Sequence, residues 1–215
     1  MSTGRFITFE GPEGGGKSTH IRELETFLSR QGIRSIRTRE PGGTKLGERI
    51  RDLLQHDEAG ESPVARAEVM LFLASRAQLV ENVIRPALAE GVWVLADRFD
   101  DSTFAYQGFG RGFPIPELRL ADTFATGGLV PDLTFLLDVP LSVMRERLSE
   151  RETQDRFERE GMEFHRKIRD GFLQLAAESP ERIVVVDSSR ACEIVRAEIE
   201  EVVRTRFHLQ SGAVI

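Results

Sequence analysis

The chain has 215 residues, of which 40% are hydrophobic and 30% are charged, as expected for one globular domain with its own core. Its formal net charge of -6 argues against binding to a nucleic-acid backbone, and no apolar run is long enough to cross a bilayer. Cys192 is the only cysteine, which excludes an internal disulfide and favours a reducing compartment. Because the first residues also lack a signal-peptide pattern, we expect a cytoplasmic protein without a membrane or nucleic-acid partner.

Short apolar runs alternate along the chain with longer stretches of helical period. The expected strands are 5–10, 35–38, 92–97, 132–139 and 182–187, and the expected helices are 17–30, 44–55, 64–89, 141–150, about 160–178 and 191–207. This alternation predicts an α/β fold, with helices on both faces of a parallel sheet. Ligands in such folds lie beyond the carboxyl ends of the strands, which here carry Glu10, Asp97, Asp138 and Asp187. We expect a single domain over 1–208 and a tail over 209–215 that follows no pattern and is a candidate for disorder.

The segment from Gly11 to Ser18, GPEGGGKS, matches the phosphate-loop pattern G-x-x-x-x-G-K-[ST] and lies between an expected strand and an expected helix. Glycines let backbone N–H groups turn toward a phosphate, and the helix N-terminus adds partial positive charge. Lys17 would reach the β- and γ-phosphates of ATP, and the Ser18 hydroxyl would bind Mg²⁺. The alternative is a glycine-rich turn that only joins strand to helix. The predicted ATP-binding residues are Gly11, Pro12, Glu13, Gly14, Gly15, Gly16, Lys17, Ser18 and Thr19.

Two further strands are followed by arginines that suit a second phosphate. Arg39 lies in TREPGGT, where a proline and two glycines form a rigid turn. Asp97 and Arg98 come directly after a buried strand. The Asp97 carboxylate would help to position Mg²⁺, and the Arg98 guanidinium would hold an acceptor phosphate with its fork of donors. The alternatives are an ordinary turn with a surface arginine and a structural Asp–Arg ion pair.

Phe72 and Arg76 lie four residues apart in the expected helix 64–89 and therefore share one face. A phenyl ring can stack on a planar base, and a guanidinium can hydrogen-bond to the carbonyl at its edge. Periodicity alone favours two simpler interpretations, which are core packing for Phe72 and a solvated helix face for Arg76.

The stretch over about 148–160 is polar, rich in arginine and without a core pattern, which indicates a short lid. Phosphoryl transfer needs positive charge on the transferred group and the exclusion of water, and an arginine-rich lid supplies both. Arg151 and Arg156 are the predicted catalytic residues of this lid. The alternative is a solvated helix face that neighbouring glutamates balance, and it fits Arg145 and Arg159 better.

Together these segments resemble the bacterial thymidylate kinases, a family of nucleoside-monophosphate kinases. The resemblance runs over nearly the whole chain, through FITFEGPEGGGKST, REPGGT, LFLASR, ADRFDDSTFAYQG, PDLTFLLDV and DRFE. It implies a P-loop NTPase fold with a five-stranded parallel sheet, and a homodimer. It also implies that the chain uses ATP and Mg²⁺ to phosphorylate dTMP to dTDP, a step of dTTP synthesis for DNA.

The resemblance implies roles for individual residues as well. Arg39 and Arg98 would hold the dTMP phosphate, Phe72 would stack on thymine, and Arg76 would bond to the ring. Tyr106 would lie against the sugar 2′ position. The implied dTMP-binding residues are Glu13, Arg39, Phe72, Arg76, Arg98, Ser102, Tyr106 and Gln107.

The phosphate loop contains no arginine, which is similar to the members of the family that carry their catalytic arginine in the lid. The implied catalytic residues are therefore Lys17, Arg98, Arg151 and Arg156, with Ser18 and Asp97 at the metal. Phe99 stands where tyrosine is frequent in the family, so no hydroxyl acts at that position.

Three other functions fit parts of the pattern. A deoxynucleoside kinase needs a carboxylate base for a neutral 5′-hydroxyl, whereas two strand-end arginines suit an acceptor that is already charged, such as this or another monophosphate. A P-loop switch or assembly ATPase needs a residue that positions water and has no second basic pocket. A nucleotide-binding protein without catalysis would not need Lys17, Ser18 and Asp97 intact.

Overall fold

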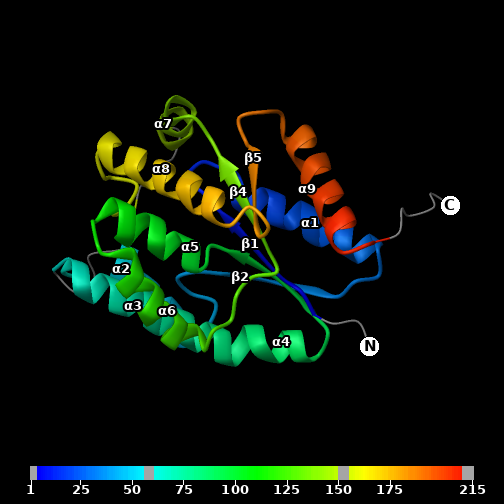
Figure 1. Cartoon of the computed structure of the whole chain (residues 1–215), viewed down its shortest axis with the longest axis horizontal. Helices are drawn as coiled ribbons and strands as arrows, with labels where there is room; N and C mark the ends of the chain where they lie inside the picture. Colours follow the sequence, from blue (N-terminus) through cyan, green and yellow to red (C-terminus); the bar gives the residue numbers. More distant parts are fainter. Residues whose placement is uncertain (1–3, 56–60, 150–154, 210–215) are drawn as a thin grey trace.

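The computed structural model describes residues 4–55, 61–149 and 155–209. In this part of the chain, five parallel strands form one sheet in the order β2-β3-β1-β4-β5, with helices on both faces (Figure 1). The strands are β1 Phe6–Glu10, β2 Ser35–Arg39, β3 Trp93–Asp97, β4 Leu133–Asp138 and β5 Ile183–Asp187. The helical segments are α1 Lys17–Arg30, α2 Lys45–Gln55, α3 Ala65–Leu79, η1 Val80–Ile84, α4 Arg85–Ala89, α5 Asp100–Thr103, η2 Phe104–Gly110, α6 Ile115–Thr126, α7 Leu141–Ser149, α8 Met162–Glu178 and α9 Cys192–Arg206. The predicted α/β fold with a five-stranded parallel sheet is confirmed.

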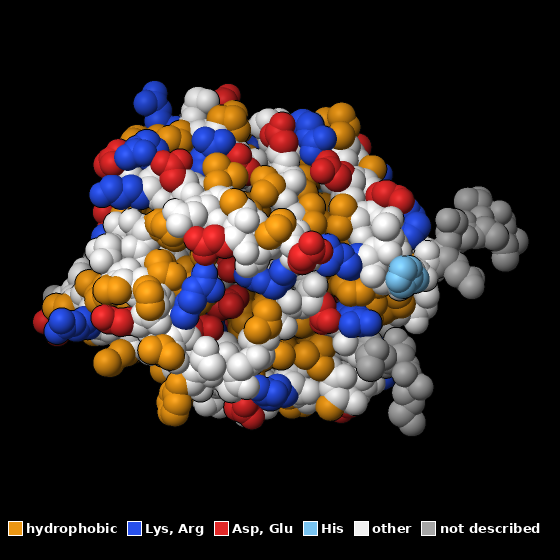
Figure 2. Space-filling model, viewed as in Figure 1, with side chains coloured by type: hydrophobic (Ala, Val, Ile, Leu, Met, Phe, Trp, Pro, Cys, Tyr) orange, Lys and Arg blue, Asp and Glu red, His pale blue; other side chains and the backbone are white. Residues whose placement is uncertain are grey.

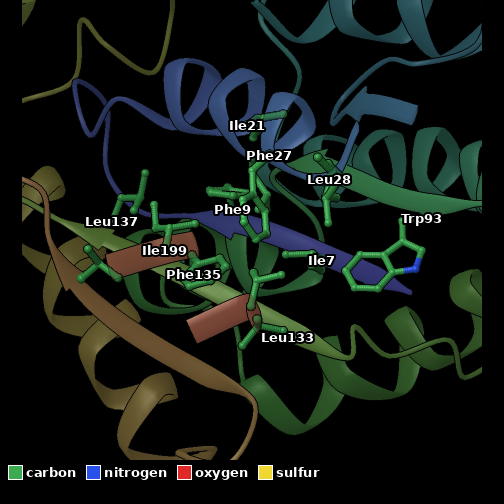
Figure 3. Packing of buried hydrophobic residues seen from close by; sticks show 14 of the residues in the cluster. Ile7, Phe9, Ile21, Phe27, Leu28, Trp93, Leu133, Phe135, Leu137 and Ile199 are labelled. Atoms are coloured by element: carbon green, nitrogen blue, oxygen red, sulfur yellow. The ribbon is translucent and has the colours of Figure 1, made fainter. Parts of the chain in front are cut away.

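The strands send alternate side chains into two apolar layers. Ile7 and Phe9 of β1 face the layer that α1 and α9 cover, where Phe9 packs against Phe135 with ring centroids 5.3 Å apart (Figure 3). Phe6 belongs to the opposite layer, where its ring meets the ring of Phe99 edge to face at 4.9 Å. Because both faces of the sheet are covered, the central strands are apolar at nearly every position, which explains why continuous runs predicted them.

The expected helix 64–89 is one helical run with a π-helical segment in its middle. Segment η1 separates α3 from α4, and the Arg85 N–H donates to the Val80 carbonyl, five residues back. Pro86 follows at once and has no N–H to offer to the preceding turn. A wider turn at this point lets the helical direction continue past the proline.

The sequence pattern predicted no secondary structure for 98–131, where the structure contains α5, η2 and α6. Helix α6 was missed because two of its large apolar residues point outward: Leu120 is 75% exposed and Phe124 is 92% exposed. Two signals were nevertheless present. Pro116 stands in the first turn, and Gly127 ends the helix in the left-handed conformation with φ of 58°.

The register of the central strands brings their carboxyl ends to one edge of the sheet. Phe9 pairs with Asp97, and Asp97 pairs with Arg39, so β1, β3 and β2 end side by side. The chain order reverses between β3 and β4 on either side of β1, which is where parallel sheets bind ligands. Among the described residues, no helix is long and apolar enough to cross a bilayer.

The predicted tail and the predicted lid are described only in part. Leu209 packs against the layer of α1 and α9, and its N–H donates to the Arg204 carbonyl at 2.9 Å. The rest of the tail predicted over 209–215 lies outside the described residues, as does the central part of the predicted lid.

Candidate active site

The phosphate loop spans the turn between β1 and α1. Gly11 has φ of +128°, and a Cβ there would lie 2.4 Å from the Leu137 carbonyl oxygen of β4. Gly16, with φ of +78°, immediately precedes α1 and accepts hydrogen bonds from the N–H groups of Thr19 and His20. The glycines therefore allow a tight backbone conformation that residues with side chains would not adopt. The loop leads directly into the N-terminus of α1, where an anion is favoured.

Lys17 and Ser18 lie at the start of α1, where they face the end of β3. The Lys17 ammonium is buried and donates to the carbonyls of Gly11 at 3.1 Å and Pro12 at 2.9 Å. Burial, followed by the charge of Arg98, lowers the pKa of Lys17. The Ser18 hydroxyl donates to Asp97 Oδ2 at 2.7 Å, so the two predicted metal-binding residues are in contact.

This hydroxyl–carboxylate pair fits Mg²⁺ rather than a metal held by protein ligands alone. The described residues contain no cluster of three or more His, Cys, Asp or Glu side chains that could hold a metal ion. Mg²⁺ commonly takes one or two protein ligands and completes its octahedron with phosphate oxygens and waters. Ser18 and Asp97 would supply the protein side of such a site.

Arg98 connects the phosphate loop to the acceptor side. Its φ of 71° is unusual for a residue with a side chain, and its N–H is fixed by the Phe9 carbonyl at 2.9 Å. One end of the guanidinium donates to the Gly11 carbonyl at 3.1 Å and to the Ser102 hydroxyl at 3.0 Å. The other end pairs with the Glu13 carboxylate and donates to the Tyr106 hydroxyl at 3.0 Å.

Glu10 is linked to Arg98 through the Ser102 hydroxyl. The Ser102 hydroxyl, which accepts from Arg98, donates to Glu10 Oε2 at 2.5 Å, and the Phe99 N–H donates to Glu10 Oε1 at 2.7 Å. Burial and then the charge of Asp101 raise the pKa of Glu10 from 4.5 to about 7, although Arg98 and the two hydrogen bonds act in the opposite direction.

A cavity of about 370 Å³ collects nearly all of the predicted site residues that the structure describes. Gly11, Pro12 and Arg156 do not line it. Those that do are Glu13, Gly14, Gly15, Gly16, Lys17, Ser18, Thr19, Arg39, Phe72, Arg76, Asp97, Arg98, Ser102, Tyr106 and Gln107. The strand-end carboxylates Asp138 and Asp187 are elsewhere: Asp138 forms a bidentate pair with Arg169, and Asp187 accepts from Ser189.

The apolar end of the cavity is a cluster of aromatic rings. Phe157 lies 5.8 Å from Phe72 and 5.9 Å from Tyr106, measured between ring centroids. Phe72 therefore faces the cavity in company with other rings, which suits the stacking of a flat base. Phe157 is a residue that the sequence analysis quoted within DRFE without giving it a role.

Arg76 lies beside these rings and is 1% exposed, so the interpretation of a solvated helix face is wrong. Its guanidinium pairs with Glu40 at 2.6 Å and Asp122 at 2.8 Å, and it donates to the Phe99 carbonyl at 2.9 Å. Two buried carboxylates thus compensate a buried cation that reaches the cavity.

The basic rim of the cavity holds Arg39 and a second arginine, Arg51, that the sequence analysis missed. Arg39 is half-exposed and pairs with Glu48 at 2.7 Å, while Glu48 also accepts from the Gly43 N–H at 2.8 Å. Arg51 donates to the Pro41 carbonyl at 3.0 Å, and burial followed by the charge of Arg39 lowers its pKa. Arg51 belongs to the expected helix 44–55, but nothing in its helical spacing marked it as a site residue.

Of the two predicted lid arginines, only Arg156 belongs to the described residues. Arg151 lies outside the described residues, so its role stays a prediction. Arg156 donates through Nη2 to Glu68 Oε2 at 2.6 Å and through Nε to the Leu54 carbonyl at 3.0 Å. Its donors are thereby directed to α2 and α3, and its catalytic role also stays a prediction.

A cavity that is lined both by a phosphate loop and by further arginines defines a P-loop nucleotide kinase, because it can hold two phosphate groups end to end. Comparison with known proteins narrows this class. The family model described as thymidylate kinase matches residues 9–199. The chain is 46% identical over 196 residues to the thymidylate kinase of Chromobacterium violaceum, covering 91% of this chain and 92% of that protein.

Other relatives agree with this match. Identity is 49% over 197 residues to the thymidylate kinase of Carboxydothermus hydrogenoformans, covering 92% of this chain and 95% of that protein. It is 49% over 212 residues to the thymidylate kinase of Desulfovibrio desulfuricans, covering 94% and 97%. The chain belongs to the thymidylate kinase family, as the resemblance implied.

The raised pKa of Glu10 gives a testable dependence of stability on pH. The folded state holds a proton on Glu10 up to about pH 7, whereas the unfolded chain releases it near 4.5, so this group's contribution to stability is lost as the pH rises through 7. Glu10→Gln mimics the protonated form at every pH. We expect the unfolding free energy of the parent to fall relative to Glu10→Gln by about 1 kcal/mol between about pH 6 and about pH 8.

Urea unfolding of both proteins at the two pH values measures this difference. Parallel profiles for the parent and Glu10→Gln would show that Glu10 keeps an ordinary pKa in the folded protein.

Proposed function

We propose that the chain transfers the γ-phosphate of ATP to dTMP in a complex with Mg²⁺, and that Arg98 holds the acceptor phosphate. Its family membership supports the reaction, and one observation carries the site assignment. The Arg98 guanidinium lies between the Gly11 carbonyl of the phosphate loop and the hydroxyl of Tyr106, which lines the same cavity as the loop. A phosphate bound there is opposite the γ-phosphate of a nucleotide in the loop.

The donor half of the site is the loop itself. The N–H groups at the start of α1 and the Lys17 ammonium bind the phosphates of ATP, and Lys17 exchanges its loop carbonyls for β- and γ-oxygens. Ser18 and Asp97 would hold Mg²⁺, which when bound would neutralise charge on the transferred group.

The acceptor half is built for a nucleotide that is already phosphorylated. Arg98 and Arg39 offer two permanent charges to the dTMP phosphate, and Glu13 keeps the Arg98 fork in place. The attacking atom is an anionic phosphate oxygen, so the reaction requires alignment and charge neutralisation and no strong general base. Arg151 of the predicted lid would add to this neutralisation.

The base and sugar of dTMP fit the other end of the cavity. Thymine stacks on Phe72 within the aromatic cluster, and Arg76 donates to its O4 carbonyl. The amide of Gln107 accepts from the N3–H of the ring. The Arg98 guanidinium carbon lies over the ring of Tyr106, 5.0 Å from the ring centroid. This fixed pair fills the space that a ribose 2′-hydroxyl would need.

The test of this function is ADP release with ATP, Mg²⁺ and a panel of acceptors. We expect strong activity with dTMP, weaker activity with dUMP, and little with dCMP, UMP or thymidine. Of these, dCMP has no N3–H to donate, UMP carries a 2′-hydroxyl for which the Arg98–Tyr106 pair leaves no space, and thymidine has no phosphate. Activity with thymidine but not dTMP would identify a nucleoside kinase. ADP release that does not depend on any acceptor would identify an ATPase.

We also propose that the protein is a cytoplasmic homodimer that associates through α3 and α6. These helices pack side by side and present Met70, Leu120 and Phe124, which are 70%, 75% and 92% exposed. Hydrophobic side chains gather along this lower left part of the molecule (Figure 2, with the helices labelled in Figure 1). Apolar side chains on neighbouring helices suit burial against a second copy. The free, exposed thiol of Cys192 suits a reducing compartment.

A charge at the centre of this surface should separate the subunits. We expect Phe124→Glu to be a folded monomer at micromolar concentration, since a carboxylate cannot be buried against its own copy without a partner. Light scattering during size-exclusion chromatography gives the mass. Ile194→Glu, at a half-exposed position on α9, is the control and should remain dimeric. A monomeric parent, or a dimeric Phe124→Glu, would contradict the proposed interface.

A further inference from the structure

Glu68 is a buried carboxylate behind the base end of the cavity, and it does not itself line the cavity. It lies in the first turn of α3 and is 1% exposed. Its Oε1 accepts from Gln107 Nε2 at 2.9 Å, and its Oε2 accepts from Arg156 Nη2 at 2.6 Å. A buried carboxylate is retained only where its partners compensate it, so these contacts define what Glu68 does.

The contact with Gln107 fixes which end of that amide faces the cavity. An ionised carboxylate can only accept, so the amide nitrogen of Gln107 has to point toward Glu68. Gln107 is 1% exposed and lines the cavity. With its NH₂ group held behind, the amide carbonyl is left to face the ligand as an acceptor.

This orientation discriminates between pyrimidines. Thymine and uracil carry a hydrogen on N3 and can donate to a carbonyl, whereas cytosine carries a lone pair there and would be repelled. A site built to accept a ligand hydrogen bond disfavours an analogue that cannot donate it.

The contact with Arg156 acts on the same end of the cavity. Arg156 is anchored by Glu68 and the Leu54 carbonyl, and its guanidinium lies 4.5 Å from the Phe157 ring centroid. Phe157 in turn meets the rings of Phe72 and Tyr106. One carboxylate therefore holds both the polar edge of the base pocket and its aromatic wall.

We propose that Glu68 is a specificity-determining positioning residue, which holds the Gln107 amide with its carbonyl toward the base and fastens Phe157 to the aromatic wall through Arg156. Arg156 is then also a positioning residue, in place of the catalytic role that its sequence context predicted. The inference rests on the proposed binding of the dTMP base beside Gln107.

The test compares Glu68→Gln with the parent on dTMP and dCMP. An amide at position 68 can donate as well as accept, so Gln107 is free to turn its NH₂ group to the ligand. We expect the ratio of kcat/KM for dTMP to that for dCMP to fall about tenfold or more, mostly through KM, as for the loss of one charge-assisted hydrogen bond. A general loss of structure would lower both activities and leave the ratio unchanged.

Glu160→Gln is the matched control. Glu160 pairs with Arg111 at 2.6 Å, and Arg111 also lies 3.6 Å from Glu68, so this variant removes a neighbouring carboxylate without touching Gln107. Its ratio should equal that of the parent. If Glu68→Gln shows no cooperative thermal unfolding and is therefore not folded, Glu68→Asp replaces it. We expect the ratio of kcat/KM for dTMP to that for dCMP to fall several-fold in Glu68→Asp, because the shorter carboxylate withdraws from Gln107.

Gln107→Leu separates failure of this inference from failure of the proposed base site. If Gln107→Leu abolishes the preference for dTMP while the folded Glu68 variant keeps the parental ratio, Gln107 binds the base but Glu68 does not orient it, and the inference is overturned. If Gln107→Leu itself keeps the parental ratio, the proposed binding of the base at Gln107 is wrong and the inference falls with it.

Discussion

The position of Arg98 is the constraint on which the site depends. The residue directly follows β3, the neighbour of the central strand β1. It takes a left-handed backbone conformation with φ of 71° and sends its guanidinium back across the end of β1. There the cation contacts the Gly11 carbonyl, Ser102, Glu13 and Tyr106. Strained conformations of this kind persist where the surrounding structure holds them for function. A single fixed charge thereby contacts both the phosphate loop and the part of the cavity in which we propose that the acceptor binds.

Several buried charged groups with compensating partners surround this cation. Behind Arg98, Glu10 accepts from Ser102 and the Phe99 N–H, and beside it Arg76 is compensated by Glu40 and Asp122. Each group is costly to bury alone and tolerable within its network. The networks therefore restrict where the arginines can point, and preorganised charge of this kind is what phosphoryl transfer requires from a protein. The apolar layers that enclose the sheet provide the rigid frame.

The sequence predicted those parts of the fold whose residues lie next to one another in the chain. Buried strands are continuous apolar runs, and the phosphate loop depends on its own glycines, Lys17 and Ser18, so both were recognised. Helix α6 was missed because Leu120 and Phe124 point away from the core, against the usual pattern. Glu68 and the donors of Arg156 could not be assigned, since their partners are tens of residues away in the chain. Arg51 lies only ten residues from its partner Pro41, but its position in the helical pattern does not mark it as a site residue. The family resemblance supplied the substrate, which spacing alone left open.

Binding of each substrate to Arg98→Met tests the central claim most directly. Titration calorimetry would measure the affinity for dTMP, and separately that for ATP with Mg²⁺, in the parent and the variant. If Arg98 serves the acceptor phosphate, the affinity for dTMP falls about ten- to a hundredfold, as for lost charge-assisted hydrogen bonds, while that for ATP changes by no more than about threefold. Unchanged binding of dTMP, or an equal loss for both nucleotides, would contradict the account, because Arg98 would then belong to neither half of the site in particular.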